Sequence, residues 1–178
     1  MNAYRLQIAL GKHHTNHQPA FEETNMKDLA RLLAALLFAC FAVGACAQSL
    51  DEAKAMVEAA LAHHKAVGHE AAMNDFVEGN PQWHKGLTMY LVAVQYDGQM
   101  LAHTMNRKIV GKNMLEARDA QGKPFIQEII RSIKATGSAT VEAAWTNPQT
   151  KKIDDAVVYA KQLNGMDAYV GVMFFKNK

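Results

Sequence analysis

The chain has 178 residues, with 19 lysine and arginine side chains against 17 aspartate and glutamate side chains, a net charge of +2. Charges of both signs alternate without a long basic run, which argues against a nucleic-acid-binding or membrane-surface function. The length suits one domain. Both cysteines, Cys40 and Cys46, lie near the N-terminus. The rest of the chain therefore has no thiol nucleophile, cysteine zinc site or haem attachment motif.

Residues 26–47 have the layout of a secretory signal peptide. A short basic start precedes an apolar run that ends in small residues, with Ala45 and Ala47 in the positions that a signal peptidase requires. The apolar run is shorter than the roughly 20 residues that span a bilayer. We predict cleavage near Ala47, with a lipoprotein anchored at Cys46 as the alternative. Residues 1–25 are predicted to be a mis-assigned upstream extension or a disordered segment.

The exported product would be residues 48–178, a single domain that is periplasmic or secreted. Its first predicted element is a long helix from Ser49 to about Val77, where apolar residues recur at helical spacing. Ser49 and Glu52 have the spacing of a capping box, which marks the start of the helix. Gly68 interrupts the helical pattern and could bend the helix.

Beyond Pro81 the pattern changes to that of β-strands. Residues 88–96 are rich in β-branched and aromatic side chains, and Asp97-Gly98 directly after them favours a tight hairpin. A second strand, residues 99–105, is expected to return from this turn. A polar stretch, residues 106–122, follows.

A short helix is predicted between Pro124, which suits the first turn of a helix, and Gly137, which suits its C-terminal end. Three further strands are predicted at residues 139–145, 156–163 and 168–175, with turn-forming residues between them. Because these connections are of hairpin length, the three strands should form an antiparallel meander. The predicted fold class is α+β, with a long N-terminal helix packed on a five-stranded antiparallel sheet.

The predicted strands are apolar on both faces, so both faces of the sheet must be covered. The long helix can cover one face, and the polar stretch with the short helix can roof the other. A sheet roofed by loops is a natural place for a small-molecule cavity. Alternation along the second strand places His103 on the same face as Leu101 and Met105.

Several short motifs follow one another in a defined order between residues 49 and 175. They are Asp97-Gly98, Leu101-Ala102-His103, Gly111-Lys112-Asn113, Asp119 to Phe125, Trp145 to Pro148, Tyr159-Ala160-Lys161 and Gly171-Val172. In order and spacing this set resembles a single Cache domain, the PAS-like extracellular sensor module of bacterial receptors. One departure is Thr104, where the family often has proline.

The resemblance implies a PAS-like sheet with a loop roof, beneath which a small organic ligand binds. In such domains the ligand is often a carboxylate, and a helix passes the signal to the membrane. No transmembrane helix or signalling domain follows Phe175, so ligand binding would be reported through a partner, such as a membrane receptor or another envelope protein.

Five side chains on the predicted strands are candidate ligand contacts. Lys161 could hold a carboxylate, to which Tyr159 on the same strand face could donate a hydrogen bond; at a wet edge Lys161 would instead extend into water. His103 could donate to a carboxylate or be satisfied by the backbone. Trp145 and Tyr90 could wall the cavity or be ordinary core residues.

No nucleophile with a base, no suitably framed pair of carboxylates and no phosphate-binding loop is apparent, so we expect neither an enzyme nor a cofactor. The histidines of the long helix lack the i, i+4 spacing of a zinc pair and are predicted to face solvent. They are His63, His64 and His69.

The leading hypothesis is an exported small-molecule-binding domain of sensor type, for a small carboxylate or a similar metabolite. A second hypothesis is an envelope protein–protein interaction module with a vestigial pocket, which could form a homodimer through the long helix. A third is a non-covalent haem or metal protein that uses His103, Met105 or His84.

Overall fold

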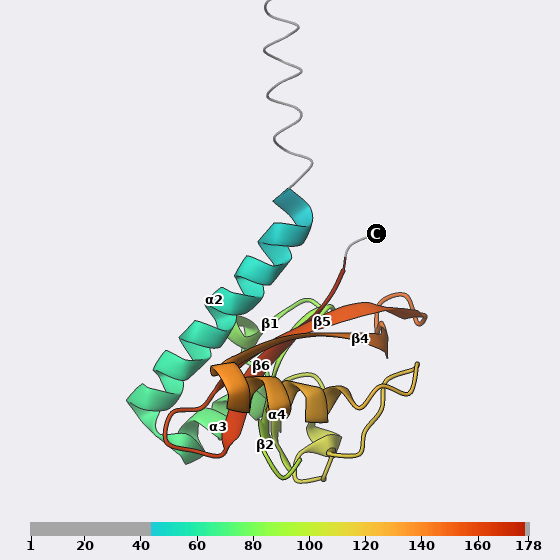
Figure 1. The fold of residues 1–178 in the computed structure, drawn as a ribbon. Helices are drawn as coiled ribbons and strands as arrows, with labels where there is room; N and C mark the ends of the chain where they lie inside the picture. Colours follow the sequence, from blue (N-terminus) through green and yellow to red (C-terminus); the bar gives the residue numbers. More distant parts are fainter. Residues whose placement is uncertain (1–43, 177–178) are drawn as a thin grey trace, which may run out of the picture. The chain divides into compact units, whose positions relative to one another are not determined.

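The computed structural model describes residues 44–176, which belong to one compact unit of the chain (Figure 1). Most of the predicted signal peptide and the extension before it lie outside the described residues. Helix α2 spans Gly44–Val67, so Ser49 lies inside this helix and not at its N-terminal cap as predicted. No helix within residues 44–176 combines the length and the apolar character that crossing a membrane requires.

Gly68 divides the predicted long helix into two. Helix α2 ends at Val67, and helix α3 spans His69–Glu78. Gly68 has φ 87° and ψ 169°, a conformation that glycine adopts readily because it has no Cβ. The predicted weak point is thus confirmed as a complete break.

The break turns α3 back against α2 and brings the histidines of the two helices into contact with partners. Nε2 of His63 lies 2.7 Å from a carboxylate oxygen of Asp75. Nε2 of His64 lies 3.3 Å from Nδ1 of His69. These three histidines are half-buried, and the prediction that they face solvent is wrong because it assumed one straight helix.

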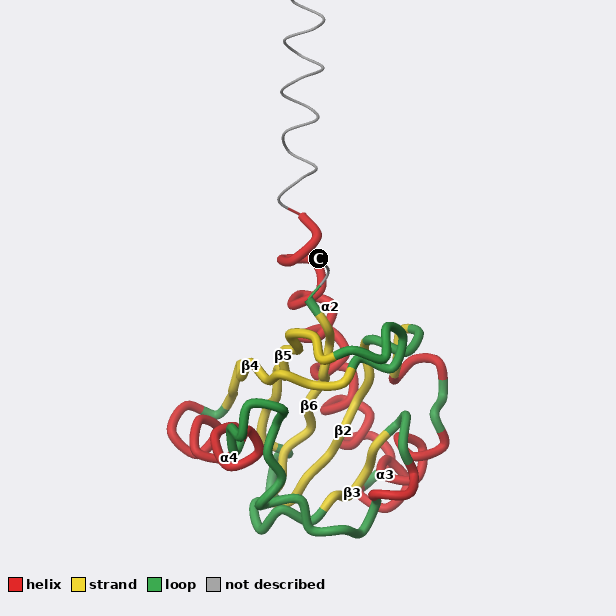
Figure 2. Tube along the Cα trace, turned by 90° about the vertical axis from the view of Figure 1, so that its right-hand side faces the viewer, coloured by secondary structure: helices red, strands yellow, loops and turns green. Residues whose placement is uncertain are grey.

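The sheet is antiparallel throughout, in the order β1-β2-β6-β5-β4, with β3 also paired to β2 (Figure 2). The strands are β1 His84–Lys85, β2 Met89–Gln95, β3 Met100–His103, β4 Ser138–Thr146, β5 Ile153–Gln162 and β6 Ala168–Phe175. The predicted α+β fold and the meander of the last three strands are confirmed. The two-residue strand β1 adds to the five predicted strands.

Two apolar cores lie on the two faces of the sheet. On one face α2 and α3 pack Val57 and Phe76 against residues such as Leu91. On the other face the cover is helix α4, Phe125–Thr136, together with residues 104–124, a segment that we call the roof. The roof contains only one short 3₁₀ turn, Arg107–Ile109.

Helix α4 has a strongly one-sided pattern, and its buried residues are Phe125, Ile126, Ile129, Ile130 and Ile133. Full burial of each such side chain stabilises the fold by about 1.5–3 kcal/mol. The helix ends as predicted at Gly137, which has a left-handed conformation and donates its N–H to the carbonyl of Ile133 at 2.7 Å.

A bulge in β3 changes which side chains share a face. Pairing with β2 skips Leu101, because Met100 and Ala102 pair with consecutive residues of β2. Leu101 packs into the helix-side core, whereas His103 reaches the roofed face. The prediction that these two residues share a face is wrong, since a bulge interrupts the period of two.

The buried carboxylate of Asp119 fastens one end of the roof. Its Oδ1 accepts the N–H groups of Gln121 and Lys123 at 2.9 and 2.8 Å, and its Oδ2 accepts the N–H of Ala144 in β4 at 2.9 Å. The bond from Ala144 contributes most to lowering the pKa of Asp119. Asp119 therefore joins the roof to the strand that carries Trp145.

The middle of the roof is fastened to the β2–β3 turn, whose Asp97-Gly98 hairpin is confirmed. The Asn113 side chain donates to the carbonyl of Asp97 at 2.8 Å and accepts the N–H of Leu115 at 2.9 Å. Gly98 has φ 94°, and a Cβ built on it would lie 2.5 Å from the Cβ of Leu115. The close approach of the roof to this turn thus requires glycine.

We expect Asp119→Asn to lower the free energy of unfolding at pH 7 by about 2 kcal/mol, because the amide accepts fewer of the three N–H groups. The folded-state pKa of Asp119 lies below the unfolded value of about 3.9, so this contribution is complete above that value and is lost as the pH falls through the folded-state pKa. Urea titrations of the unmodified protein and the variant at pH 7 and pH 3 measure the contribution of Asp119 to the free energy of unfolding.

The control is Asp155→Asn, at an exposed carboxylate of β5. Equal losses of unfolding free energy for both variants at pH 7 would contradict the anchoring role of Asp119.

Replacement of Gly98 by alanine should cost more than the same change at Gly122. Both glycines have left-handed φ angles, 94° and 83°, but nothing lies within 4 Å of a Cβ on Gly122. We expect Gly122→Ala to cost about 1 kcal/mol for its backbone conformation alone, and Gly98→Ala about 3 kcal/mol because the roof must also move. Thermal unfolding of the two variants tests this, and similar melting temperatures would show that the contact with Leu115 is unimportant.

Candidate ligand-binding site

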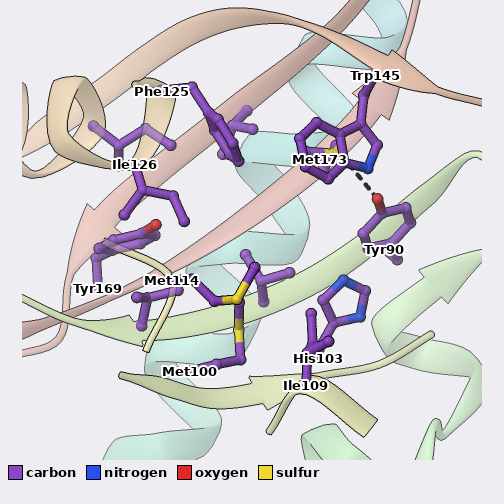
Figure 3. A pocket seen from close by; sticks show the side chains of 14 residues that line it. Tyr90, Met100, His103, Ile109, Met114, Phe125, Ile126, Trp145, Tyr169 and Met173 are labelled. Carbon is purple, nitrogen blue, oxygen red and sulfur yellow. Dashed lines mark hydrogen bonds between the residues drawn. The ribbon is translucent and has the colours of Figure 1, made fainter. Parts of the chain in front are cut away.

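A cavity of about 50 Å³ lies between the sheet and its roof (Figure 3). The strands β2, β5 and β6 form its floor, and α4, β4, β3 and the roof form its walls. The lining residues are Tyr90, Val92, Val94, Met100, His103, Ile109, Met114, Phe125, Ile126, Ile129, Trp145, Val158, Tyr169 and Met173. One water molecule needs roughly 10–15 Å³, so the cavity accommodates a molecule of only a few non-hydrogen atoms.

The lining is apolar apart from a few uncharged polar groups. The Tyr90 hydroxyl donates to the sulfur of Met173 at 2.9 Å, and thioether sulfur is a weak acceptor. Burial raises the pKa of Tyr90 to about 12 and raises the pKa of Tyr169 as well. Both phenols therefore keep their protons at neutral pH and can donate hydrogen bonds.

His103 is held as a neutral donor. Its Nδ1 accepts the backbone N–H groups of Asn106 and Met105 at 3.0 and 3.3 Å. The ring proton of the neutral form must therefore be on Nε2. Burial lowers the pKa of His103 to about 4. The ring packs against Tyr90 with centroids 5.0 Å apart, on the cavity side of β3 (Figure 3).

Trp145 and the methionines shape the rest of the site. The Trp145 ring meets Phe125 edge-on, with centroids 5.2 Å apart. Met100 and Met114 lie beside one another near His103 in Figure 3. Methionine side chains are flexible and adapt to apolar groups of different shape, so this end of the cavity can adjust to its occupant.

Of the five predicted ligand contacts, the structure brings three together in the cavity: Tyr90, His103 and Trp145. The other two, Lys161 and Tyr159, lie on the opposite face of the sheet. Tyr159 packs against the helix-side core. The expected cation is therefore not part of this cavity.

Lys161 has a partner of its own on the helix side. Its Nζ lies 2.7 Å from Oε1 of Glu58 in α2, and this hydrogen bond is the main cause of the raised pKa of Lys161. Alternation along β5 explains the separation, because Val158 lines the cavity and its neighbours on the other face do not. Sequence periodicity grouped Lys161 with Tyr159 correctly, but it did not indicate which face of the sheet is hollow.

The residues proposed for haem or metal binding are not brought together. Only His103 lines the cavity, while Met105 is 37% exposed and His84 is a half-buried residue of β1 whose Nδ1 lies 3.2 Å from the carbonyl of Gly86. Coordination through Nε2 of His103 would move its proton to Nδ1, which faces two N–H donors. Within residues 50–176, no group of three or more His, Cys, Asp and Glu side chains is placed to hold a metal ion.

Several cavity residues were not identified from the sequence. Tyr169 and Met173 alternate along β6, and their shared face was visible in the sequence, but nothing there marked it as the cavity face. Met114 lies in the roof, where no periodicity exists to place it. Met100 joins His103 only because of the β3 bulge.

The tautomer and pKa of His103 can be measured directly. We expect ring ¹⁵N chemical shifts to show a proton on Nε2 at pH 7, and the ring to titrate near pH 4 rather than near 6.5. Because the folded-state pKa is lowered, stability is retained above pH 6.5 and falls as the pH drops towards 4. A ring that titrates near pH 6.5, or carries its proton on Nδ1, would contradict this account. A variant that lacks His84, which lies outside the cavity lining, provides the control for signal assignment.

Comparisons with known proteins agree with this architecture. A family model for single Cache domain 2 matches residues 42–177. No curated protein matches the chain. A periplasmic sensor domain of a chemotaxis protein is similar in structure, with 22% identity and a TM-score of 0.62, over 74% of this chain and 97% of that chain.

Two other solved structures are similar. One is a Cache chemosensory domain that recognises carboxylic acids, with 14% identity and a TM-score of 0.56, over 86% of this chain and 99% of that chain. The other is a methyl-accepting chemotaxis protein from Vibrio parahaemolyticus, with 17% identity and a TM-score of 0.51, over 84% and 95%. At these identities the structures establish the fold, and the match of the family model covers most of the chain. The protein belongs to the single Cache domain 2 family.

Proposed function

We propose that this protein is a ligand-binding domain of sensor type, which takes up a small organic molecule between the sheet and the roof. The observation that carries the proposal is the cavity itself, which is walled by aromatic and thioether groups and has hydrogen-bond donors at Tyr90 and His103. A largely apolar cavity with a few placed polar groups is the usual form of a small-molecule site.

The domain would act outside the cytoplasm. Support comes from the signal-peptide pattern of residues 26–47 and from the similarity to a periplasmic sensor domain. Cleavage near Ala47 would leave residues 48–178 as the binding domain, and a lipid anchor at Cys46 is the alternative. Ligand binding would then be reported to a membrane receptor or another envelope partner.

Carboxylic acids are among the first ligands to test, because a similar Cache domain recognises them. The cavity differs from the expected carboxylate site in one respect: Lys161 is paired with Glu58 on the other face of the sheet. Recognition in this cavity would depend on His103, Tyr90 and Trp145.

A second candidate function is the envelope interaction module. The observation that favours it is the small volume of the cavity, about 50 Å³, together with the bond between the Tyr90 hydroxyl and Met173, which already satisfies one of the donors. In that case α2, which could pair with a second copy, would carry the function.

A screen of the purified protein against short organic acids, amides, ketones and amino acids tests the binding function. A ligand at a hundredfold excess over its Kd stabilises the folded state by about 2.7 kcal/mol, which raises the melting temperature by several degrees. We expect His103→Leu to weaken binding about tenfold, since one hydrogen bond of about 1–1.5 kcal/mol is lost.

Lys161→Ala is the matched control, because it removes a polar strand residue from the opposite face, and it should leave the Kd unchanged. Loss of binding in Lys161→Ala but not in His103→Leu would place the site on the helix side of the sheet. If no compound stabilises the folded protein, and the protein forms a dimer whose stability no compound alters, the interaction module is the better account.

A further inference from the structure

The cavity offers hydrogen-bond donors without a cation. None of the fourteen described residues that line it carries a charged side chain at neutral pH. The titratable groups in the lining are Tyr90, His103 and Tyr169, and burial keeps all three neutral. A buried anion would therefore have no opposite charge beside it.

Three lysines on the surrounding elements are engaged elsewhere, and the two other lysines of the roof, Lys108 and Lys112, are not part of the lining. Lys134 of α4 lies 5.0 Å from the ring centre of Tyr96, and Lys123 of the roof pairs with Glu128 at 3.0 Å. Lys161 of β5 points to the other face of the sheet. None of these three ammonium groups belongs to the lining of the cavity.

His103 is also prevented from becoming the missing cation. Protonation would place a hydrogen on Nδ1, where the N–H groups of Asn106 and Met105 already point at it. Both hydrogen bonds would be lost, and three N–H donors would face one another. A bound carboxylate therefore cannot convert this ring into an imidazolium without reorganising the end of β3.

Burial of a carboxylate without a partner charge is costly, whereas a neutral carbonyl needs only hydrogen bonds. Taking the proposed binding function as its basis, we infer that the cavity selects an uncharged ligand. The polar end of this ligand is a neutral hydrogen-bond acceptor, such as the carbonyl of a small amide or ketone, or a carboxylic acid in its protonated form. His103 Nε2–H donates to the acceptor, and the methionine and isoleucine side chains surround the apolar end.

Three probes of nearly equal size distinguish the charge classes: propionamide, 2-butanone and propionate. Each is titrated into the purified ¹⁵N-labelled protein at pH 5.5 and 7.5, with cavity residues followed by NMR. We expect the amide and the ketone to bind with the same Kd at both pH values. The apparent Kd of propionate should be about 100-fold weaker at pH 7.5, because the protonated fraction of a carboxylic acid with a pKa of about 4 to 5 falls tenfold per pH unit.

The possible results separate this inference from the proposed function. If propionate binds at pH 7.5 at least as tightly as propionamide, with a Kd that does not change with pH, the inference is wrong and the binding function stands. If none of the three probes shifts the signals of cavity residues at either pH, the inference is overturned, and the binding function is then decided by the wider compound screen described above.

A cation placed in the cavity should reverse the preference. Met114→Lys puts an ammonium group near His103, and we expect it to raise the affinity for propionate relative to propionamide at pH 7.5 at least tenfold. Met105→Lys, at an exposed methionine outside the lining, is the matched control and should leave the ratio unchanged. A folded Met114→Lys protein with an unchanged ratio would contradict the inference, and the pH series on the unmodified protein tests it even if this variant fails to fold.

Discussion

The structure depends on a sheet that is apolar on both faces. Every residue of β6, at the centre of the sheet, is buried, so each face needs its own cover. Helices α2 and α3 cover one face and satisfy their own backbone groups. The roof on the other face has little regular structure, and its N–H and carbonyl groups must find partners elsewhere. Asn113 in the middle of the roof and Asp119 near its C-terminal end provide some of these partners.

The cavity is a consequence of this unequal cover. Helix α4 packs its isoleucines against part of the roofed face, and the anchored roof spans the remainder without filling it. The space that remains is small, and the hydrogen-bond donors in its lining are neutral. A single polar residue in this setting has a large effect, because hydrogen bonds and unpaired charges both weigh more in an apolar, low-dielectric environment. For this reason the tautomer of His103, which leaves Nε2–H free to donate, has a greater effect on ligand binding than the number of lining residues.

The site was partly predictable. Tyr90, His103 and Trp145 were identified from strand patterns and ordered motifs, and all three line the cavity. Lys161 was identified by the same reasoning but lies on the other face. A period of two shows which residues share a face, but it does not show which face is hollow. That depends on whether a helix or a loop covers the face, and local sequence does not specify it.

By itself, the sequence determined the order of the elements, the hairpin at Asp97-Gly98 and the helix end at Gly137, because these follow from local backbone preferences and side-chain periodicity. Only the tertiary structure decided that Gly68 breaks the first helix completely, that a bulge turns His103 towards the roof, and that the cavity contains no cation. Each of these outcomes depends on contacts between segments far apart in the chain. Such contacts compete with local preferences, and packing of the whole domain determines the result.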